Sequence, residues 1–190
     1  MLDQTLARRL RLVGLDVDGV LTDGGVYLGR VGDHAVDLKR FDIQDGLAVL
    51  MLRAAGITVV LVSGRDSEAT ALRAREIGVD EVVQDDAAMK LPAFAGILAR
   101  RAIAFDECAF AGDDLADLPV LRRVALPIAV ANAVAEVKAV ATYVTTAPGG
   151  HGAVREIAEA ILKARGDWDG LVRQYLEERG DVAQRAAGSR

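Results

Sequence analysis

Apolar and polar positions along this chain predict buried strands that alternate with helices. Strands are predicted where apolar, often β-branched residues run together, at residues 10–16, 57–65, 79–84, 107–114, 126–131 and 143–146. Between them apolar residues recur at helical spacing, which predicts helices at 46–56, 66–78, 91–101, 115–124, 133–141 and 152–165. Strands alternating with helices of this length indicate right-handed crossover connections. The predicted fold is therefore a three-layer, Rossmann-like α/β domain with a mostly parallel sheet.

One segment breaks this alternation. Residues 25–42 are rich in glycine and strand-like, without a helical period, so we expect a β-hairpin inserted after the first strand, with its turn near residues 30–33. No stretch of the chain is long enough to add a large lid domain. The expected organisation is one domain over residues 1–165 and a tail over 166–190, with a short helix at about 168–178 and a disordered end.

Composition narrows the class of protein. The chain has 190 residues, a net charge of −5 and a pI near 5.1, which argues against a nucleic-acid partner. Its single cysteine, Cys108, lies in an apolar run and is expected to be a buried strand residue, so no intrachain disulfide is available. We find no signal-peptide pattern and no apolar stretch approaching ~20 residues, the length that spans a membrane. A cytoplasmic protein acting on a small molecule is the expectation.

Acidic side chains follow two of the predicted strands. Asp16 and Asp18 lie two residues apart at the end of the first strand and point the same way. Asp113, Asp114 and Asp117 follow the strand at 107–114. A lone aspartate at a strand end is more often a helix N-cap. Two acidic clusters at one edge of a parallel sheet, where ligands bind, instead predict a Mg²⁺ site.

Two other polar features follow neighbouring strands. Ser63, Gly64 and Arg65 stand where a strand passes into a helix, and the hydroxyl and backbone N–H groups there suit an anion. Lys90 precedes a helix at the same edge, where its ammonium would bind phosphate. A carboxylate pair, a hydroxyl and a lysine fit phosphoryl transfer onto an aspartate, followed by hydrolysis with help from a second acid. This chemistry needs no His or Cys nucleophile.

The segments DVDGVLTDG, SGR, Lys90 and GDDLAD, in this order and spacing, resemble the four motifs of the haloacid dehalogenase-like phosphatases. The resemblance implies that Asp16 is the nucleophile and a Mg²⁺ ligand. It implies that Asp18 is the general acid/base and binds Mg²⁺ through its backbone carbonyl. By the same resemblance, Ser63 and Lys90 hold the transferring phosphoryl group.

The second acidic cluster also takes its roles from this resemblance. Asp113 would complete the Mg²⁺ site, and Asp114 and Asp117 would be carboxylates close by. The predicted substrate contacts are Thr22, Gln44, Gly64, Arg65 and His151. Arg65 pairing with Glu68, and His151 as a merely exposed residue at a helix start, stay open as alternatives.

The absent lid, the hairpin and the segments FDIQDG (41–46) and GGHGAVREI (149–157) resemble the family of 3-deoxy-D-manno-octulosonate-8-phosphate phosphatases over about residues 10–163. The resemblance implies that this sugar-acid phosphate is the substrate. It also implies a homotetramer in which the hairpins pack together and a neighbouring subunit helps to close each site.

The chain departs from this family at two positions. Family members carry Arg where Gln44 and His151 stand, and a lost guanidinium weakens the case for the same sugar. A nonulosonate (sialic-acid-like) 9-phosphate, or another small phosphorylated sugar, is therefore an alternative substrate. A non-catalytic oligomerisation module and a phosphotransferase are alternatives of other classes. The intact Asp16, Asp18, Lys90 and Asp113 argue against the first, and the absent lid argues against the second.

Overall fold

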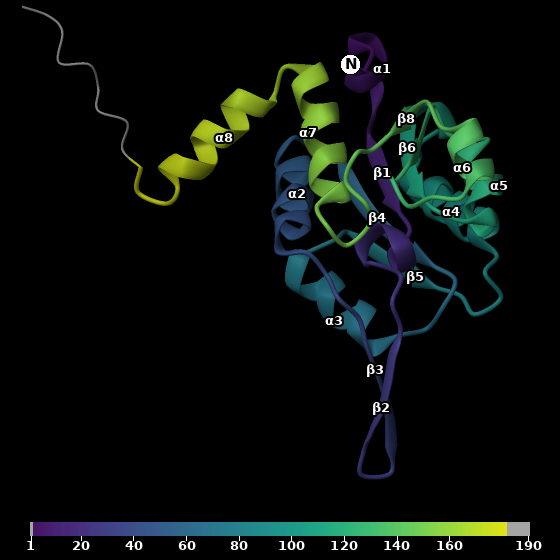
Figure 1. The fold of residues 1–190 in the computed structure, drawn as a ribbon. Coiled ribbons are helices and arrows are strands. Elements are labelled where there is room, and N and C mark those ends of the chain that lie inside the picture. The colour runs from purple at the N-terminus through teal and green to yellow at the C-terminus, as the bar shows by residue number, and fades with distance from the viewer. Residues whose placement is uncertain (1, 182–190) are drawn as a thin grey trace, which may run out of the picture.

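The computed structural model describes residues 2–181 and has one parallel six-stranded sheet at its centre (Figure 1). The strand order is β5-β4-β1-β6-β7-β8, and every neighbouring pair is parallel. The strands are β1 (Leu12–Leu15), β4 (Thr58–Ser63), β5 (Glu81–Gln84), β6 (Cys108–Gly112), β7 (Leu126–Ala129) and β8 (Tyr143–Val144). The predicted three-layer α/β fold with an inserted hairpin and no large cap is confirmed.

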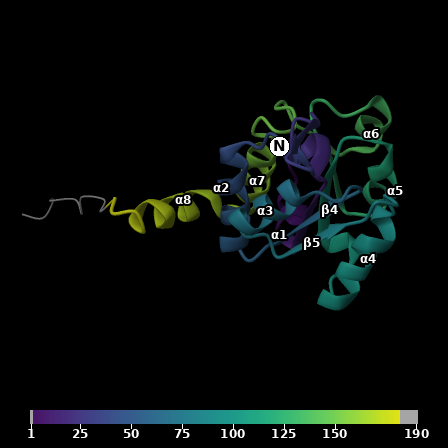
Figure 2. The ribbon, with the colours of Figure 1, turned by 90° about the horizontal axis from the view of Figure 1, so that it is seen from below.

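Helices cover both faces of this sheet (Figures 1 and 2). One layer consists of α1 (Gln4–Arg9), α2 (Ile43–Ala54), α3 (Glu68–Ile77) and α7 (Ala153–Arg165). The other consists of α4 (Lys90–Arg101), α5 (Leu118–Leu121) and α6 (Ala135–Val140). Because both faces are covered, β1 and β6 are buried along their whole length.

The sheet packs tightly where β1 meets the second helical layer. Phe94 of α4 and Phe110 of β6 are fully buried and meet edge to face, with ring centroids 5.3 Å apart. A Cβ atom at Gly14 would lie 2.5 Å from the Phe110 ring, so only glycine fits in β1 at this point. This packing fixes the strand that carries Asp16 at its carboxyl end.

The hairpin stands away from the body of the molecule (Figure 1). It consists of antiparallel β2 (Tyr27–Val31) and β3 (His34–Leu38), with Gly32 in the turn at φ +60°, so the predicted hairpin and its turn are confirmed. Its apolar residues face outward: Leu28 is 79% exposed and Val31 68%.

Helix α8 (Trp168–Glu177) also extends from the body, where the short helix in the tail was expected (Figure 2). The disordered end expected beyond it falls largely outside the described residues. Between residues 2 and 181, none of the helices combines the length and apolar character needed to cross a membrane.

Element boundaries differ from the sequence prediction in three places. Helix α2 begins at Ile43 rather than 46, because the Asp42 side chain caps it by accepting from the Gln44 N–H. The helix predicted at 115–124 is shortened to α5, since a turn at Leu115–Asp117 precedes it. Helix α1 was not predicted, and it starts at a cap made by Asp3.

Candidate active site

Asp16 leaves the end of β1 at the middle of the sheet. Its N–H donates to the Ala111 carbonyl of β6 at 3.0 Å, which extends the strand pairing by one residue. The chain then turns tightly through Val17–Leu21, with Gly19 at φ +95°. A Cβ atom at Gly19 would lie 2.0 Å from Asp113 Oδ2, so glycine allows the two acidic loops to come together.

Lys90 joins the two acidic clusters. It is the first residue of α4, and its Nζ lies 2.7 Å from Asp16 Oδ1 and 2.6 Å from Asp117 Oδ1. All three side chains are buried. The other oxygen of Asp117 accepts from the N–H groups of Asp113 and Asp114, at 3.0 and 3.2 Å. Asp117 therefore has both oxygens occupied and sets the positions of Lys90 and of the loop that bears Asp113.

Asp113 completes a cluster that suits a divalent cation. Carboxylate oxygens of Asp16, Asp113 and Asp117 lie within 4.8 Å of one another. Asp113 Oδ1 is buried and has no hydrogen-bond partner among residues 2–181, so it lacks the partner that a bound cation would supply. Because both Asp117 oxygens are occupied and Asp16 Oδ1 contacts Lys90, the oxygens left to fit Mg²⁺ are Asp16 Oδ2 and those of Asp113.

The charges in this cluster do not balance without a cation. Burial raises the pKa of Asp16 well above its usual value, and the Asp117 charge raises it further, while Lys90 opposes both. Burial, together with Asp117, also raises the pKa of Asp113 to about 6. Burial alone would lower the pKa of Lys90, but the charges of Asp16 and Asp117 outweigh it and raise that pKa. One ammonium thus faces three carboxylates.

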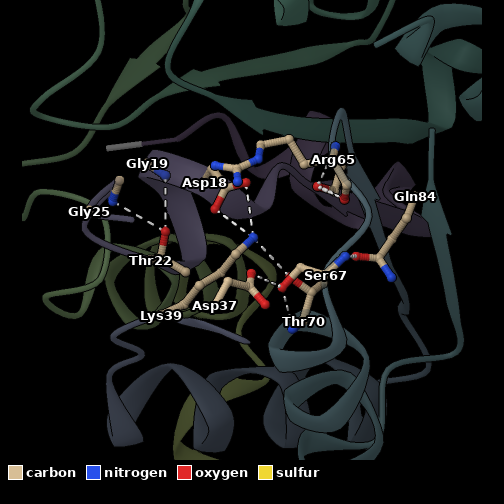
Figure 3. Close-up of polar contacts among 12 residues, drawn as sticks. Asp18, Gly19, Thr22, Gly25, Asp37, Lys39, Arg65, Ser67, Thr70 and Gln84 are labelled. Atoms are coloured by element: carbon tan, nitrogen blue, oxygen red, sulfur yellow. Dashed lines mark hydrogen bonds and ion pairs between the residues drawn. The ribbon is translucent and has the colours of Figure 1, made fainter. Parts of the chain in front are cut away.

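Asp18 lies on the other side of the loop, toward the hairpin. Its carboxylate pairs with Lys39, whose Nζ lies 2.8 Å from Oδ1 and 3.0 Å from Oδ2 (Figure 3). The Lys39 side chain has no exposed surface and also donates to Thr70 Oγ1 at 3.2 Å. Asp16 and Asp18 therefore contact different lysines.

The Ser63-Gly64-Arg65 turn follows β4, next to the start of α4. The Ser63 hydroxyl is buried, donates to the Arg65 carbonyl at 3.0 Å and accepts from the Arg65 N–H at 3.2 Å. A Cβ atom at Gly64 would lie 3.0 Å from Ala88 and 3.9 Å from Lys90 Cε, so this turn packs against the Lys90 loop. The Arg65 side chain is exposed, and between residues 2 and 181 it forms no ion pair with Glu68.

A glycine pair closes the site on the side of α7. A Cβ atom at Gly149 would lie 1.8 Å from the Gly19 carbonyl oxygen, and Gly150 donates its N–H to the Val20 carbonyl at 3.1 Å. Asn132 bridges the two loops: its Nδ2 donates to the Gly19 carbonyl at 2.9 Å and its Oδ1 accepts from the Gly149 N–H at 2.7 Å. The GGHG segment is thus fixed against the loop that carries Asp16 and Asp18.

The remaining predicted contacts fall into two groups. Gln44 and His151 are exposed at the rim, Gln44 near Gly152 and the His151 ring 3.3 Å from the Arg40 guanidinium. Thr22 is fully buried, and its hydroxyl accepts from the N–H groups of Gly19 (Figure 3) and Gly24, so it stabilises the turn. Asp114 is exposed and caps the turn at Leu115.

Sequence reasoning missed two residues at this site, Lys39 and Asn132. Lys39 lies at the base of a hairpin for which only strand pairing was predicted. Asn132 follows β7, a strand end at the same edge as the other polar groups. That position alone was a signal that could have singled out Asn132.

Comparisons with known proteins extend over most of the chain. A sequence profile of the haloacid dehalogenase-like hydrolases matches residues 81–157. The chain is 39% identical over 165 residues to the 3-deoxy-D-manno-octulosonate 8-phosphate phosphatase KdsC of Salmonella typhi, an alignment covering 87% of this chain and 86% of that protein.

Solved structures agree with this comparison. The phosphatase of that name from Moraxella catarrhalis, in complex with magnesium ion, phosphate ion and KDO, superposes with a TM-score of 0.84 at 35% identity, covering 90% of this chain and 97% of that one. The cobalt-bound deoxy-D-mannose-octulosonate 8-phosphate phosphatase of Haemophilus influenzae gives a TM-score of 0.78 at 33% identity, covering 85% and 92%.

Proposed function

The chain belongs to the 3-deoxy-D-manno-octulosonate 8-phosphate phosphatase family of haloacid dehalogenase-like hydrolases, and from this premise we propose that it hydrolyses that sugar-acid phosphate. The chain is a phosphatase, and we propose its substrate, its metal and its mechanism. The observation that carries it is the buried Asp16, held by Lys90 beside Asp113 at the end of β1. This arrangement presents a carboxylate oxygen to a phosphoryl group and a cation to the phosphoryl oxygens.

In the first step, an Asp16 oxygen forms a bond to phosphorus while the bond from phosphorus to the sugar oxygen breaks. The electron pair stays with the sugar oxygen, which takes a proton from Asp18. In the second step, Asp18 takes a proton from water as the water oxygen attacks phosphorus. This frees Asp16 and releases phosphate. Lys90 and the Ser63 turn hold the phosphoryl oxygens, and Lys90 also keeps Asp16 ionised.

Mg²⁺ fits the donors that the structure presents. The carboxylates of Asp16 and Asp113 and the backbone carbonyl of Asp18 would hold it. Bound there, it would offset repulsion between these carboxylates and a phosphate dianion. Asp117 would act by fixing the Asp113 backbone, since its own oxygens are occupied.

The sugar is selected at the rim of the site in this proposal. Gln44 and His151 are exposed there, and the Arg40 guanidinium donates to the Gly150 carbonyl beside the His151 ring. Arg40 thus supports binding of an acidic sugar even though Gln44 and His151 are not arginines. Because two arginines are replaced at these positions, a nonulosonate 9-phosphate is the second candidate substrate.

We further propose that the chain assembles into a homotetramer through its hairpin. Leu28, Val31 and Leu38 are all more than half exposed on a hairpin that projects from the body (Figure 1). Exposed apolar residues gathered on one element are typical of a surface that another protein covers. The cytoplasmic location stays a prediction.

A screen of phosphate release tests this function. We expect octulosonate 8-phosphate to be among the best of a panel of sugar-acid phosphates, with activity lost on adding a chelator and restored by Mg²⁺. Asp16→Asn should abolish phosphate release without changing the circular dichroism spectrum. Asp169→Asn, at an exposed residue of α8, should leave phosphate release unchanged. A preference for nonulosonate 9-phosphates would change the proposed substrate and leave the proposed mechanism in place. Full activity of Asp16→Asn would overturn the mechanism.

A further inference from the structure

Lys39 is a buried cation that the reaction described above does not use. Its Nζ donates to Asp18 Oδ2 at 3.0 Å and to Thr70 Oγ1 at 3.2 Å, and forms an ion-pair contact with Asp18 Oδ1 at 2.8 Å (Figure 3). The ammonium group therefore contacts both oxygens of the Asp18 carboxylate. The Lys39 side chain has no exposed surface, whereas Asp18 keeps 23% exposed. Asp18 is thus held by a buried cation while its own side chain stays partly exposed.

The chain around Lys39 is fixed by polar contacts from α3. Asp37 Oδ2 accepts from the Ser67 hydroxyl at 2.7 Å, and Ser67 also caps α3 by accepting from the Thr70 N–H at 3.3 Å. The Ser67 N–H donates to Gln84 Oε1 at 2.9 Å (Figure 3). The stem of the hairpin is therefore tied to the body of the domain, although its outer part is exposed.

A buried ammonium is costly unless its charge is compensated, and here a single carboxylate compensates it. The pair restricts the Asp18 side chain to one orientation, because turning it away would leave Lys39 without a counter-ion. A proton-transferring carboxylate must stay within hydrogen-bond reach of the oxygen it serves. In a protein with no large cap, the hairpin stem provides this restraint from within the same chain.

We propose that Lys39 is a positioning residue that holds the Asp18 carboxylate in place for proton transfer. The inference rests on the proposed function, in which Asp18 gives a proton to the leaving sugar oxygen and takes one from water. Lys39 keeps its own protons throughout. The competing explanation is that Lys39 only anchors the hairpin, and the experiment below separates the two.

The test uses p-nitrophenyl phosphate with enzyme in excess and Mg²⁺ present. Nitrophenolate is a good leaving group and departs without a proton, so its release reports attack by Asp16 alone. Release of phosphate reports hydrolysis of the phospho-enzyme, which needs Asp18 as the base. For Lys39→Met we expect nitrophenolate release within about threefold of wild type and phosphate release slowed by about 10-fold or more. Intact-protein mass spectrometry should show the phospho-enzyme accumulating.

Two further variants complete the design. Adding Lys39→Met to Asp18→Asn should slow phosphate release no further, because residues that act through one another are not additive. Lys163→Met removes an exposed lysine on α7 and should change neither rate. If circular dichroism shows that Lys39→Met does not fold, Lys39→Gln replaces it with the same expected result.

Several results would contradict the positioning role of Lys39. Equal slowing of both rates, unchanged phosphate release, or additive effects in the double variant would overturn the positioning role. If Asp18→Asn is slow while Lys39→Met behaves like wild type, only the inference about Lys39 fails. If Asp18→Asn itself leaves both rates unchanged, the role of Asp18 in the proposed function fails and takes this inference with it.

Discussion

Two of the four lysines in this chain are buried, and each contacts one of the two aspartates that follow β1. Lys90 is the first residue of α4 and lies between Asp16 and Asp117, with Asp113 nearby. Negative charge therefore remains in excess around Lys90. Lys39 comes from the inserted hairpin and pairs with Asp18 alone. The excess negative charge around Lys90 suits a divalent cation. The balanced ion pair of Lys39 and Asp18 instead suits the positioning of the Asp18 side chain.

Replacing Lys90 should have the greatest effect on activity. Lys90→Met removes the ammonium that binds phosphate and keeps Asp16 ionised, so kcat/KM should fall by roughly 10³-fold. Nitrophenolate release should slow as much as phosphate release, unlike the pattern expected for Lys39→Met. Mg²⁺ binding, measured by calorimetry, should persist, because the carboxylates remain and the cation itself offsets the positive charge that is lost. A variant that lost Mg²⁺ binding while attack by Asp16 stayed fast would contradict the difference drawn between the two lysines.

Asp45 is a buried carboxylate that has no lysine beside it in the described part of the chain. Its Oδ1 accepts from the Arg155 N–H at 2.8 Å, while Oδ2 is buried with no partner among residues 2–181. Burial raises the pKa of Asp45 from the usual 3.8 to about 6, against the opposing effect of the hydrogen bond from Arg155. The folded chain therefore holds this proton more tightly than the unfolded chain, which favours folding at low pH.

That contribution is complete below pH 3.8 and is lost as the pH rises through about 6. The change amounts to about 3 kcal/mol over this window. Asp45→Asn does not titrate at this position. As the pH rises from 4 to 7.5, the free energy of unfolding of wild type should therefore fall by about this amount relative to that of the variant. Urea unfolding at several pH values measures the difference. Parallel curves for the two proteins would show that Asp45 is not charged and buried as described.

Asp117 tests whether the excess charge around Lys90 holds the cation. Asp117→Asn keeps the size of the side chain but removes one counter-charge of Lys90 and loosens the Asp113 backbone. We expect Mg²⁺ affinity to fall by about 10- to 100-fold, as for other groups that orient metal ligands. Calorimetric titration checks this, with Asp169→Asn as the control. Unchanged affinity with lowered stability would assign Asp117 a purely structural role.

The smallest effect concerns the stem that supports Lys39. Ser67→Ala removes the hydrogen bond to Asp37 and the cap of α3. The free energy of unfolding should fall by about 1 kcal/mol. Phosphate release from p-nitrophenyl phosphate should slow less than in Lys39→Met, because the ion pair with Asp18 remains. Slowing as severe as that of Lys39→Met would show that the stem, rather than the ammonium, positions Asp18.

The fold was predictable because its strands are continuous apolar runs. Strands β1, β4 and β6 each lie within the predicted ranges. The helix at 115–124 was predicted too long because the Asp117 side chain turns back toward the strand end, where a Cβ atom at Gly112 would lie 2.5 Å from it. Helical spacing cannot reveal a side chain that bonds to the backbone before it.

The site, like the fold, could be predicted from the sequence only in part. Lys90 and the aspartates were predictable, because each follows a strand and the topology brings strand ends to one edge. Lys39 was not, since strand pairing in a hairpin does not say whether the lysine at its base turns inward. That depends on how Asp37 and Ser67 fix the stem to α3, a contact between residues 30 positions apart.

The account depends most on Asp16 as the group that captures phosphorus. The direct measurement is acid quenching of the Mg²⁺-loaded enzyme during turnover, followed by mass spectrometry of its peptides. We predict a phosphoryl group on the peptide that contains Asp16, absent from Asp16→Asn and longer-lived in Lys39→Met. A phosphoryl group on another residue, or turnover with none on the protein at any time, would contradict the account.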